Sequence, residues 1–172
     1  MKIIGGWGSA RALSVRPWVS HGAFGMAIAI VLAGCASAPK PTQVTGGSIE
    51  ATAQVNPSVN KRPSPVIVRL YELKSDASFK SADFVAMYQR DTAELAADIV
   101  AREEMALQPG ESRPIAAKTL APEVKFIAAA AFFRDIEHAQ WRSIAPVLAN
   151  TNQTVTVRAD ANAVSVTVTA AK

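Results

Sequence analysis

An uncharged apolar run near the start of the chain, Ala23–Ala33, most constrains what the rest can become. Residues 1–34 contain three basic side chains and no acidic one. The run is too short to cross a bilayer, which needs about 20 apolar residues, but its length is typical of the apolar core of a signal peptide. We therefore predict that residues 1–34 are an export signal and that residues 35–172 form the mature protein.

The signal segment ends in Leu32-Ala33-Gly34-Cys35, which resembles the lipobox of bacterial lipoproteins. Cys35 is the only cysteine, so an internal disulfide is excluded, and an ordinary buried cysteine fits poorly with this position. We expect diacylglycerol on the sulfur and acyl chains that hold the protein in a membrane. Ala36 stands where an aspartate would favour retention in the inner membrane, so the outer membrane is the expected destination.

Residues 35–172 contain 15 basic and 14 acidic side chains. This balance argues against a strongly basic surface for nucleic acid. The remaining 138 residues are enough for one domain with a single core. We expect a lipidated tether over residues 35–47, which are rich in Pro, Ser, Thr and Gly, and a folded domain over residues 48–172.

Alternating apolar residues predict a first strand over Ser48–Val55, and an enrichment in β-branched residues predicts a second over Val66–Leu73. Between them, Asn56–Pro65 contains three prolines, which excludes a helix interior or a central strand. This segment is expected to be an exposed, semi-rigid loop.

Ser81–Val100 has apolar residues at three- and four-residue steps and is the one helical candidate, with Asp91 and Thr92 as a point where it could divide. Val124–Phe133 fits a strand buried on both faces, although its four alanines leave a helix as an alternative. Near the C-terminus, valines alternate with polar residues, mostly threonines, in Thr154–Arg158 and in Val164–Thr169. This pattern predicts a terminal hairpin. One further strand is expected to end near Gln108 and another to begin at Arg113. The pattern as a whole predicts an all-β, antiparallel β-sandwich with a small helical insertion.

Residues 35–172 lack the side chains and motifs from which most active sites are built. They contain one histidine, His138, no Gly-rich phosphate loop and no sequence typical of a serine hydrolase or a zinc protease. Glu103 and Glu104 are adjacent, so a strand would point them to opposite faces, where a solvated edge or salt bridges are a better expectation than acid–base catalysis. We therefore expect no enzyme, no metal site and no cofactor.

Several short segments together resemble one known family, the outer-membrane lipoproteins of type VI secretion systems called TssJ, VasD or SciN. Besides the lipobox, the resemblance rests on six segments in order: Asn56-Pro57, Arg62–Lys74, Phe79 with Ala82–Phe84, Pro109–Arg113, Phe133–Asp135 and Trp141-Arg142.

This resemblance implies a transthyretin-like β-sandwich anchored under the outer membrane and facing the periplasm. It also implies a partner, the periplasmic C-terminal region of the inner-membrane protein TssM, and places much of the contact on the loop between the first two strands. The corresponding residues here are Asn56, Pro57, Ser58, Val59, Asn60, Lys61, Arg62 and Pro63.

Physical reasoning supports the same loop. A proline-stiffened loop loses little conformational entropy on docking, and Lys61 with Arg62 can bind carboxylates. The alternatives are that these two charges merely solvate a loop tip, and that the protein is a periplasmic lipoprotein that binds a small ligand or peptidoglycan.

Four residues near the second half of the chain, Arg134, Asp135, Trp141 and Arg142, are expected to support the fold rather than to bind a partner. The helical insertion, with Phe84, Met87 and Tyr88, is likewise expected to cover the core.

Overall fold

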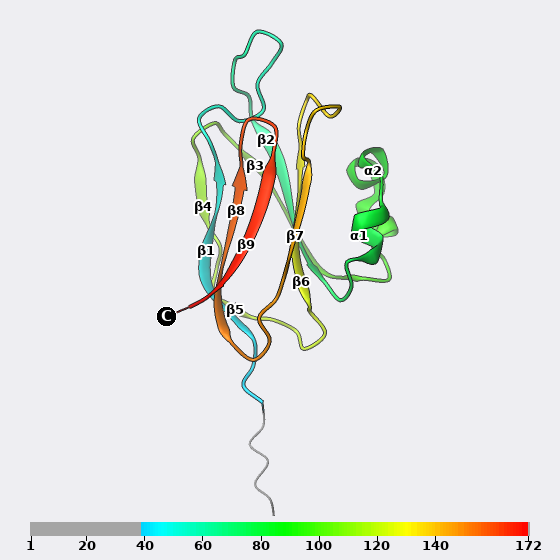
Figure 1. The fold of residues 1–172 in the computed structure, drawn as a ribbon, viewed down its shortest axis with the longest axis vertical. Helices are drawn as coiled ribbons and strands as arrows, with labels where there is room; N and C mark the ends of the chain where they lie inside the picture. The colour runs from blue at the N-terminus through cyan, green and yellow to red at the C-terminus, as the bar shows by residue number, and fades with distance from the viewer. Residues whose placement is uncertain (1–38, 172) are drawn as a thin grey trace, which may run out of the picture. The chain divides into compact units, whose positions relative to one another are not determined.

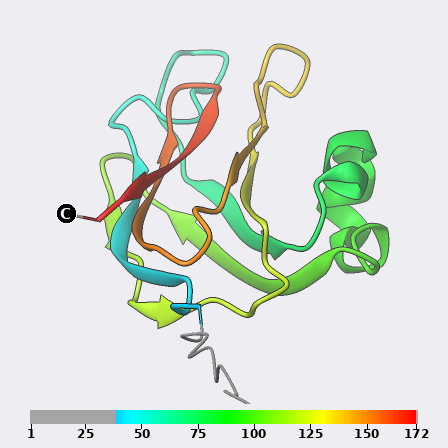
Figure 2. The same cartoon turned by 60° about the horizontal axis from the view of Figure 1, so that its bottom comes forward.

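The computed structural model describes residues 39–171, which form two facing β-sheets with a pair of short helices outside one of them (Figures 1 and 2). The first sheet has the order β4-β1-β8-β9, with β5 also paired to β1, and the second has the order β3-β2-β6-β7. The strands are β1 (Gln43–Ala51), β2 (Val66–Leu73), β3 (Ile99–Leu107), β4 (Ser112–Pro114), β5 (Lys118–Thr119), β6 (Phe126–Phe132), β7 (Arg142–Pro146), β8 (Asn152–Ala159) and β9 (Val164–Ala170). The helices are α1 (Ala77–Ser81) and α2 (Phe84–Glu94).

The second strand has the bounds and the two faces that its sequence predicts. Val66, Val68 and Leu70 point into the core between the sheets, whereas Tyr71 and Leu73 belong to a second core beneath the helices. A central strand with apolar residues on both faces is stable because each face is covered. The sheet of β2 is therefore the middle layer of a three-layer arrangement.

The alanine-rich segment is a strand, β6, and not a helix. Ala129 and Ala131 face the core between the sheets, and Ala128 and Ala130 face the helices; all four are fully buried. Antiparallel pairing with β2 and β7 satisfies the backbone of this strand, and its small side chains leave room for the bulkier side chains on either side.

The first strand differs from the prediction in place and in direction. It begins at Gln43, inside the segment expected to be a tether, and ends at Ala51 rather than Val55. It also runs parallel to β8, whereas every other strand pair is antiparallel within residues 39–171. Gly47 makes this pairing possible, because a Cβ atom there would lie 1.8 Å from the carbonyl oxygen of Val155.

The helical region is also shorter than predicted. A cap on α2 is supplied by Asp83, whose Oδ1 accepts a hydrogen bond from the Ala86 N–H. The helix kinks at Arg90, next to the predicted point of division, and ends at Glu94. Ile99 continues the apolar spacing but belongs to β3, where it pairs with Leu73 of β2.

The terminal hairpin of β8 and β9 is confirmed, with Val155, Val157, Val164 and Val166 buried in the core between the sheets. None of the helices in residues 39–171 is long and apolar enough to cross a membrane.

Candidate functional site

The loop between β1 and β2 folds as a small hairpin that projects from one end of the sandwich (Figure 1). The Lys61 N–H donates to the Ser58 carbonyl at 2.8 Å, and the Ser58 N–H donates to the Arg62 carbonyl at 2.8 Å. Lys61 has a left-handed backbone, with a φ of 57°. A turn followed by a left-handed residue is a common way to close a three-residue hairpin loop. The tip therefore has a defined backbone conformation.

Asn56 holds the base of this hairpin. Its side chain is buried, with Nδ2 donating to the Pro65 carbonyl at 2.6 Å and Oδ1 accepting from the Arg134 N–H at 2.8 Å. Its own N–H donates to the Ala161 carbonyl at 2.8 Å. Asn56 is only 4% exposed and ties the hairpin to two neighbouring loops, while its role as a contact residue stays a prediction.

The tip of the hairpin combines one apolar side chain with two cations. Val59 is 98% exposed, the most exposed of the large apolar residues in the described part of the chain. Lys61 and Arg62 are also exposed, and no carboxylate of residues 39–171 lies within ion-pair distance of either. An unpaired cation beside an exposed apolar side chain suits contact with an acidic and apolar surface.

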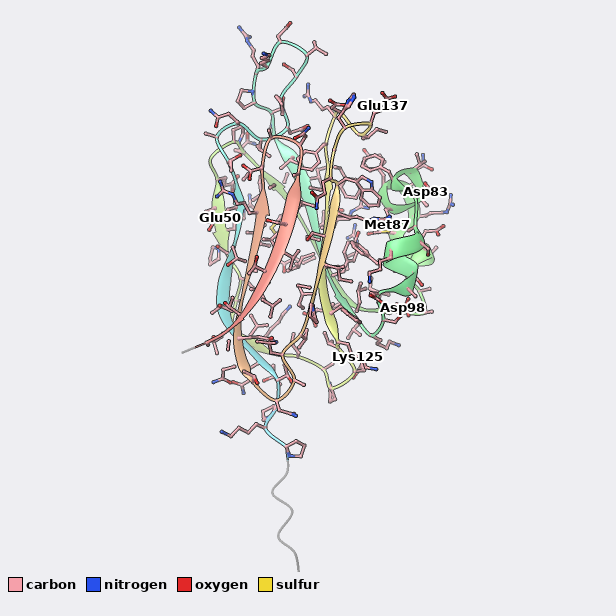
Figure 3. The ribbon with its side chains drawn as sticks, viewed as in Figure 1. Glu50, Asp83, Met87, Asp98, Lys125 and Glu137 are labelled. Atoms are coloured by element: carbon pink, nitrogen blue, oxygen red, sulfur yellow. The ribbon has the colours of Figure 1, made fainter. Side chains whose placement is uncertain are left out.

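A hollow of about 640 Å³ lies beside the hairpin. Its walls come from residues 56–59 of the hairpin, from the β6–β7 loop at Phe133–Asp135 and His138, and from the β8–β9 turn at Ala161 and Asn162. Figure 3 labels Glu137 in the β6–β7 loop, at the same end of the sandwich as the hairpin.

The sequence prediction did not assign Arg134, Asp135 or His138 to this surface. Their loop meets the hairpin only because of the strand order, for which the local sequence contains no signal. The exposed His138 ring lies 2.8 Å from Asp135 at its Nδ1, and the Arg134 side chain is exposed. The loop thus adds one cation and one Asp–His pair to the rim of the hollow.

The other residues singled out in the sequence stabilise the helical insertion. Arg142 donates to the carbonyls of Phe79 and Ala82, at 2.8 and 2.7 Å, at the end of α1. Trp141 packs edge-on against Phe84 at 5.4 Å between ring centroids. Met87 is fully buried and points from α2 toward the sheet, as labelled in Figure 3.

A charged network fixes α2 to the strands beneath it. Asp91 accepts hydrogen bonds from Tyr71 and Arg102, each at 2.7 Å, and lies 3.3 Å from Arg69. Burial acts against ionisation of Asp91, but the hydrogen bonds from Arg102 and Tyr71 outweigh it and lower its pKa below the usual range. Burial, followed by the bond to Asp91, raises the pKa of Tyr71.

Glu104 belongs to the same network. Its Oε2 lies 2.6 Å from Arg69 Nε and 2.5 Å from Arg102. These bonds, first that from Arg69, lower the pKa of Glu104. Glu104 thus has the expected ion-pair role, whereas Glu103 is exposed and forms no ion pair within residues 39–171.

No group of three or more His, Cys, Asp or Glu side chains within residues 39–171 is placed to hold a metal ion. Cys35, the predicted lipidation site, lies outside the described residues.

Comparison with known proteins identifies relatives of the chain. Residues 44–162 match the family model described as "Type VI secretion lipoprotein, VasD, EvfM, TssJ, VC_A0113". A search of curated protein sequences finds no significant match.

Solved structures of type VI secretion proteins are also similar to this chain. The T6SS lipoprotein TssJ1 from Pseudomonas aeruginosa is 31% identical, with a TM-score of 0.70 over 77% of this chain and 99% of that one. A chain from a structure described as "Type VI membrane complex" is 30% identical, with a TM-score of 0.59 over 77% of this chain and 100% of that one. A third, from a structure described as "T6SS protein TssM C-terminal domain (869-1107) from EAEC", is 27% identical, with a TM-score of 0.58 over 73% of this chain and 98% of that one.

A match over most of the folded domain, together with shared fold and identity, settles the relationship, and the chain belongs to the type VI secretion lipoprotein family.

Proposed function

We propose that this protein is anchored in the outer membrane through acyl chains on Cys35, faces the periplasm and binds the periplasmic region of a TssM-like inner-membrane protein through the β1–β2 hairpin. The observation that carries the proposal is the hairpin itself. It has a defined backbone, it projects from the sandwich, and its tip presents an exposed Val59 beside Lys61 and Arg62, neither of which pairs with a carboxylate of residues 39–171.

Physical features of the hairpin favour binding over a passive surface role. Two backbone hydrogen bonds across the loop and the side chain of Asn56 restrict the chain before any partner arrives. Less entropy is then lost on association, so more of the contact energy remains as affinity. The cations suit an acidic patch on the partner, since guanidinium and ammonium groups pair with carboxylates.

The relatives support the choice of partner. Similar chains come from structures described as a type VI membrane complex and as a TssM C-terminal domain. A lipoprotein whose anchor is at its N-terminus and whose docking hairpin lies at the far end of the domain could join the outer membrane to such a partner.

The proposal is tested by titrating the folded domain with the periplasmic region of the TssM-like protein from the same genome. We expect Lys61→Glu with Arg62→Glu to weaken binding at least tenfold, and Val59→Asp to weaken it as well, while the melting temperature stays unchanged. Lys74→Glu is the control, because this exposed lysine lies outside the hairpin and the hollow and, like Lys61 and Arg62, pairs with no carboxylate of residues 39–171. Hairpin variants that bind as tightly as the control would rule out the hairpin as the contact.

The anchor is tested separately by fractionation. Cys35→Ser should release the protein from the membrane without unfolding it. A Cys35→Ser variant that stays with the outer membrane would contradict lipidation at this residue.

A further inference from the structure

The end of the sandwich opposite the hairpin carries a second surface feature, which we call the entry pole. It consists of residues 39–42, where the described chain begins, the β5–β6 connection at residues 120–125 and the β7–β8 connection at residues 147–150. A hollow of about 530 Å³ opens there. Figure 3 labels Lys125 at this end and Glu137 at the other.

Hydrogen bonds hold the connections of the entry pole together. The Thr42 carbonyl accepts from the Leu120 N–H at 3.0 Å, and Thr42 Oγ1 accepts from the Asn150 N–H at 2.9 Å. Lys125 donates its N–H to Leu73 at 2.9 Å and accepts at its carbonyl from Val147 at 2.8 Å. These bonds tie the three connections that line the hollow to one another and to the end of β2.

Its walls are mostly apolar and carry only positive charge. Lys40 and Lys125 line the hollow, and neither lies within ion-pair distance of a carboxylate of residues 39–171. Lys118, on neighbouring β5, is paired with Glu72, and Glu123 is exposed nearby but does not line the hollow. Two free ammonium groups around an apolar depression match the chemistry of an anionic phospholipid headgroup with its glycerol and upper acyl carbons.

The length of chain before the pole limits how far it can be from the anchor. Only residues 36–38 separate Cys35 from Pro39, so these two Cα atoms lie at most about 15 Å apart even in a fully extended chain. The headgroup layer of a leaflet is itself about 5–8 Å thick. This argument rests on the proposed acylation of Cys35, which would hold the pole close to the lipid phosphates.

We infer that the entry pole binds anionic phospholipid headgroups of the leaflet that holds the acyl chains, through Lys40 and Lys125 at the rim of the apolar hollow. The contact orients the domain, so that the β1–β2 hairpin at the opposite end points away from the membrane (Figure 1). Each lysine near an anionic surface is expected to contribute about a fivefold preference for that orientation.

The test uses the full acylated chain in vesicles, with acylation first verified by mass spectrometry. A fluorophore on Asn152→Cys, beside the pole but outside the hollow, reports the proximity of nitroxide-labelled headgroups, and Val59→Cys reports the opposite end. We expect stronger quenching at Asn152→Cys in vesicles of phosphatidylethanolamine and phosphatidylglycerol than in phosphatidylcholine. Lys40→Glu with Lys125→Glu should abolish this difference, whereas Arg158→Glu should preserve it.

Quenching that does not depend on lipid charge, or that is unchanged in the variant with Lys40→Glu and Lys125→Glu, would overturn the inference. Equal quenching at Asn152→Cys and Val59→Cys would also overturn it. A melting curve of the double variant shows whether it remains folded. An acylated chain with charge-independent quenching overturns only this inference. An unmodified Cys35 overturns the proposed anchoring together with it.

Discussion

Replacing Asn56 with alanine should both destabilise the domain and loosen the hairpin. The substitution leaves the Pro65 carbonyl and the Arg134 N–H without their partner, at about 1–3 kcal/mol for each group that stays dry. It also forces alanine into a φ of 49°, which costs about 1 kcal/mol. Because water can reach part of this region through the neighbouring hollow, we expect a total loss of about 2–4 kcal/mol in the free energy of unfolding.

Two companion variants separate these contributions. Asn56→Gly loses the same hydrogen bonds but tolerates the positive φ, so it should be about 1 kcal/mol more stable than Asn56→Ala. Asn56→Asp keeps an acceptor for the Arg134 N–H but sets a buried carboxylate oxygen against the Pro65 carbonyl, so it should be at least as destabilised as Asn56→Gly.

Denaturant unfolding gives the stabilities, and titration with the TssM-like region gives the affinities at a temperature where each variant is folded. We expect Asn56→Ala to bind several-fold more weakly, because ordering the loosened hairpin then costs entropy. Unchanged stability and affinity in Asn56→Ala would refute the view that this side chain fixes the hairpin.

Three further outcomes follow from the fold. Gly47→Ala should lose about 2–5 kcal/mol in thermal or denaturant unfolding, since its Cβ would collide with Val155, and Gly46→Ala should lose less, since its Cβ meets nothing within 4 Å; equal losses would contradict the close approach of β1 and β8. Arg142→Met should lose about 1.5–3 kcal/mol and increase hydrogen exchange in α1, whose terminal carbonyls it leaves unpaired; protection of α1 equal to the wild type would argue against this role. The pKa of Asp91 is lower in the folded state, so its contribution to stability is complete above its ordinary value of 3.8 and is lost as pH falls through the folded value; unfolding from pH 6 to pH 2 should show a smaller pH dependence in Asp91→Asn, and an identical profile would contradict the assignment.

The sequence predicts the strands that have a strong local pattern. Val66–Leu73 is enriched in β-branched residues, and the observed β2 has the same bounds. The Val/Thr alternation near the C-terminus likewise gives the hairpin of β8 and β9. In these segments the local preference and the tertiary environment agree.

Where pairing over long sequence distances decides the structure, the local pattern fails. Gly46 and Gly47 lie in the segment predicted to be a tether, yet Gly47 is required because β1 passes close to β8 there. Ile99 continues the helical spacing of the preceding segment, but its backbone pairs with Leu73.

The candidate site shows the same division. A cluster of prolines marks Asn56–Pro65 as a loop, and the structure confirms an exposed tip. The buried role of Asn56 depends on Arg134 and Ala161, which are distant in the sequence and become neighbours only through the strand order.

The most direct test of the central claim is calorimetric titration of the folded domain with the periplasmic region of the TssM-like protein, comparing the wild type with a variant whose residues 56–65 are replaced by a Gly/Ser linker. The account predicts saturable binding by the wild type and its loss in a variant that still folds. Equal binding by the two proteins, or no binding by the folded wild type, would contradict it.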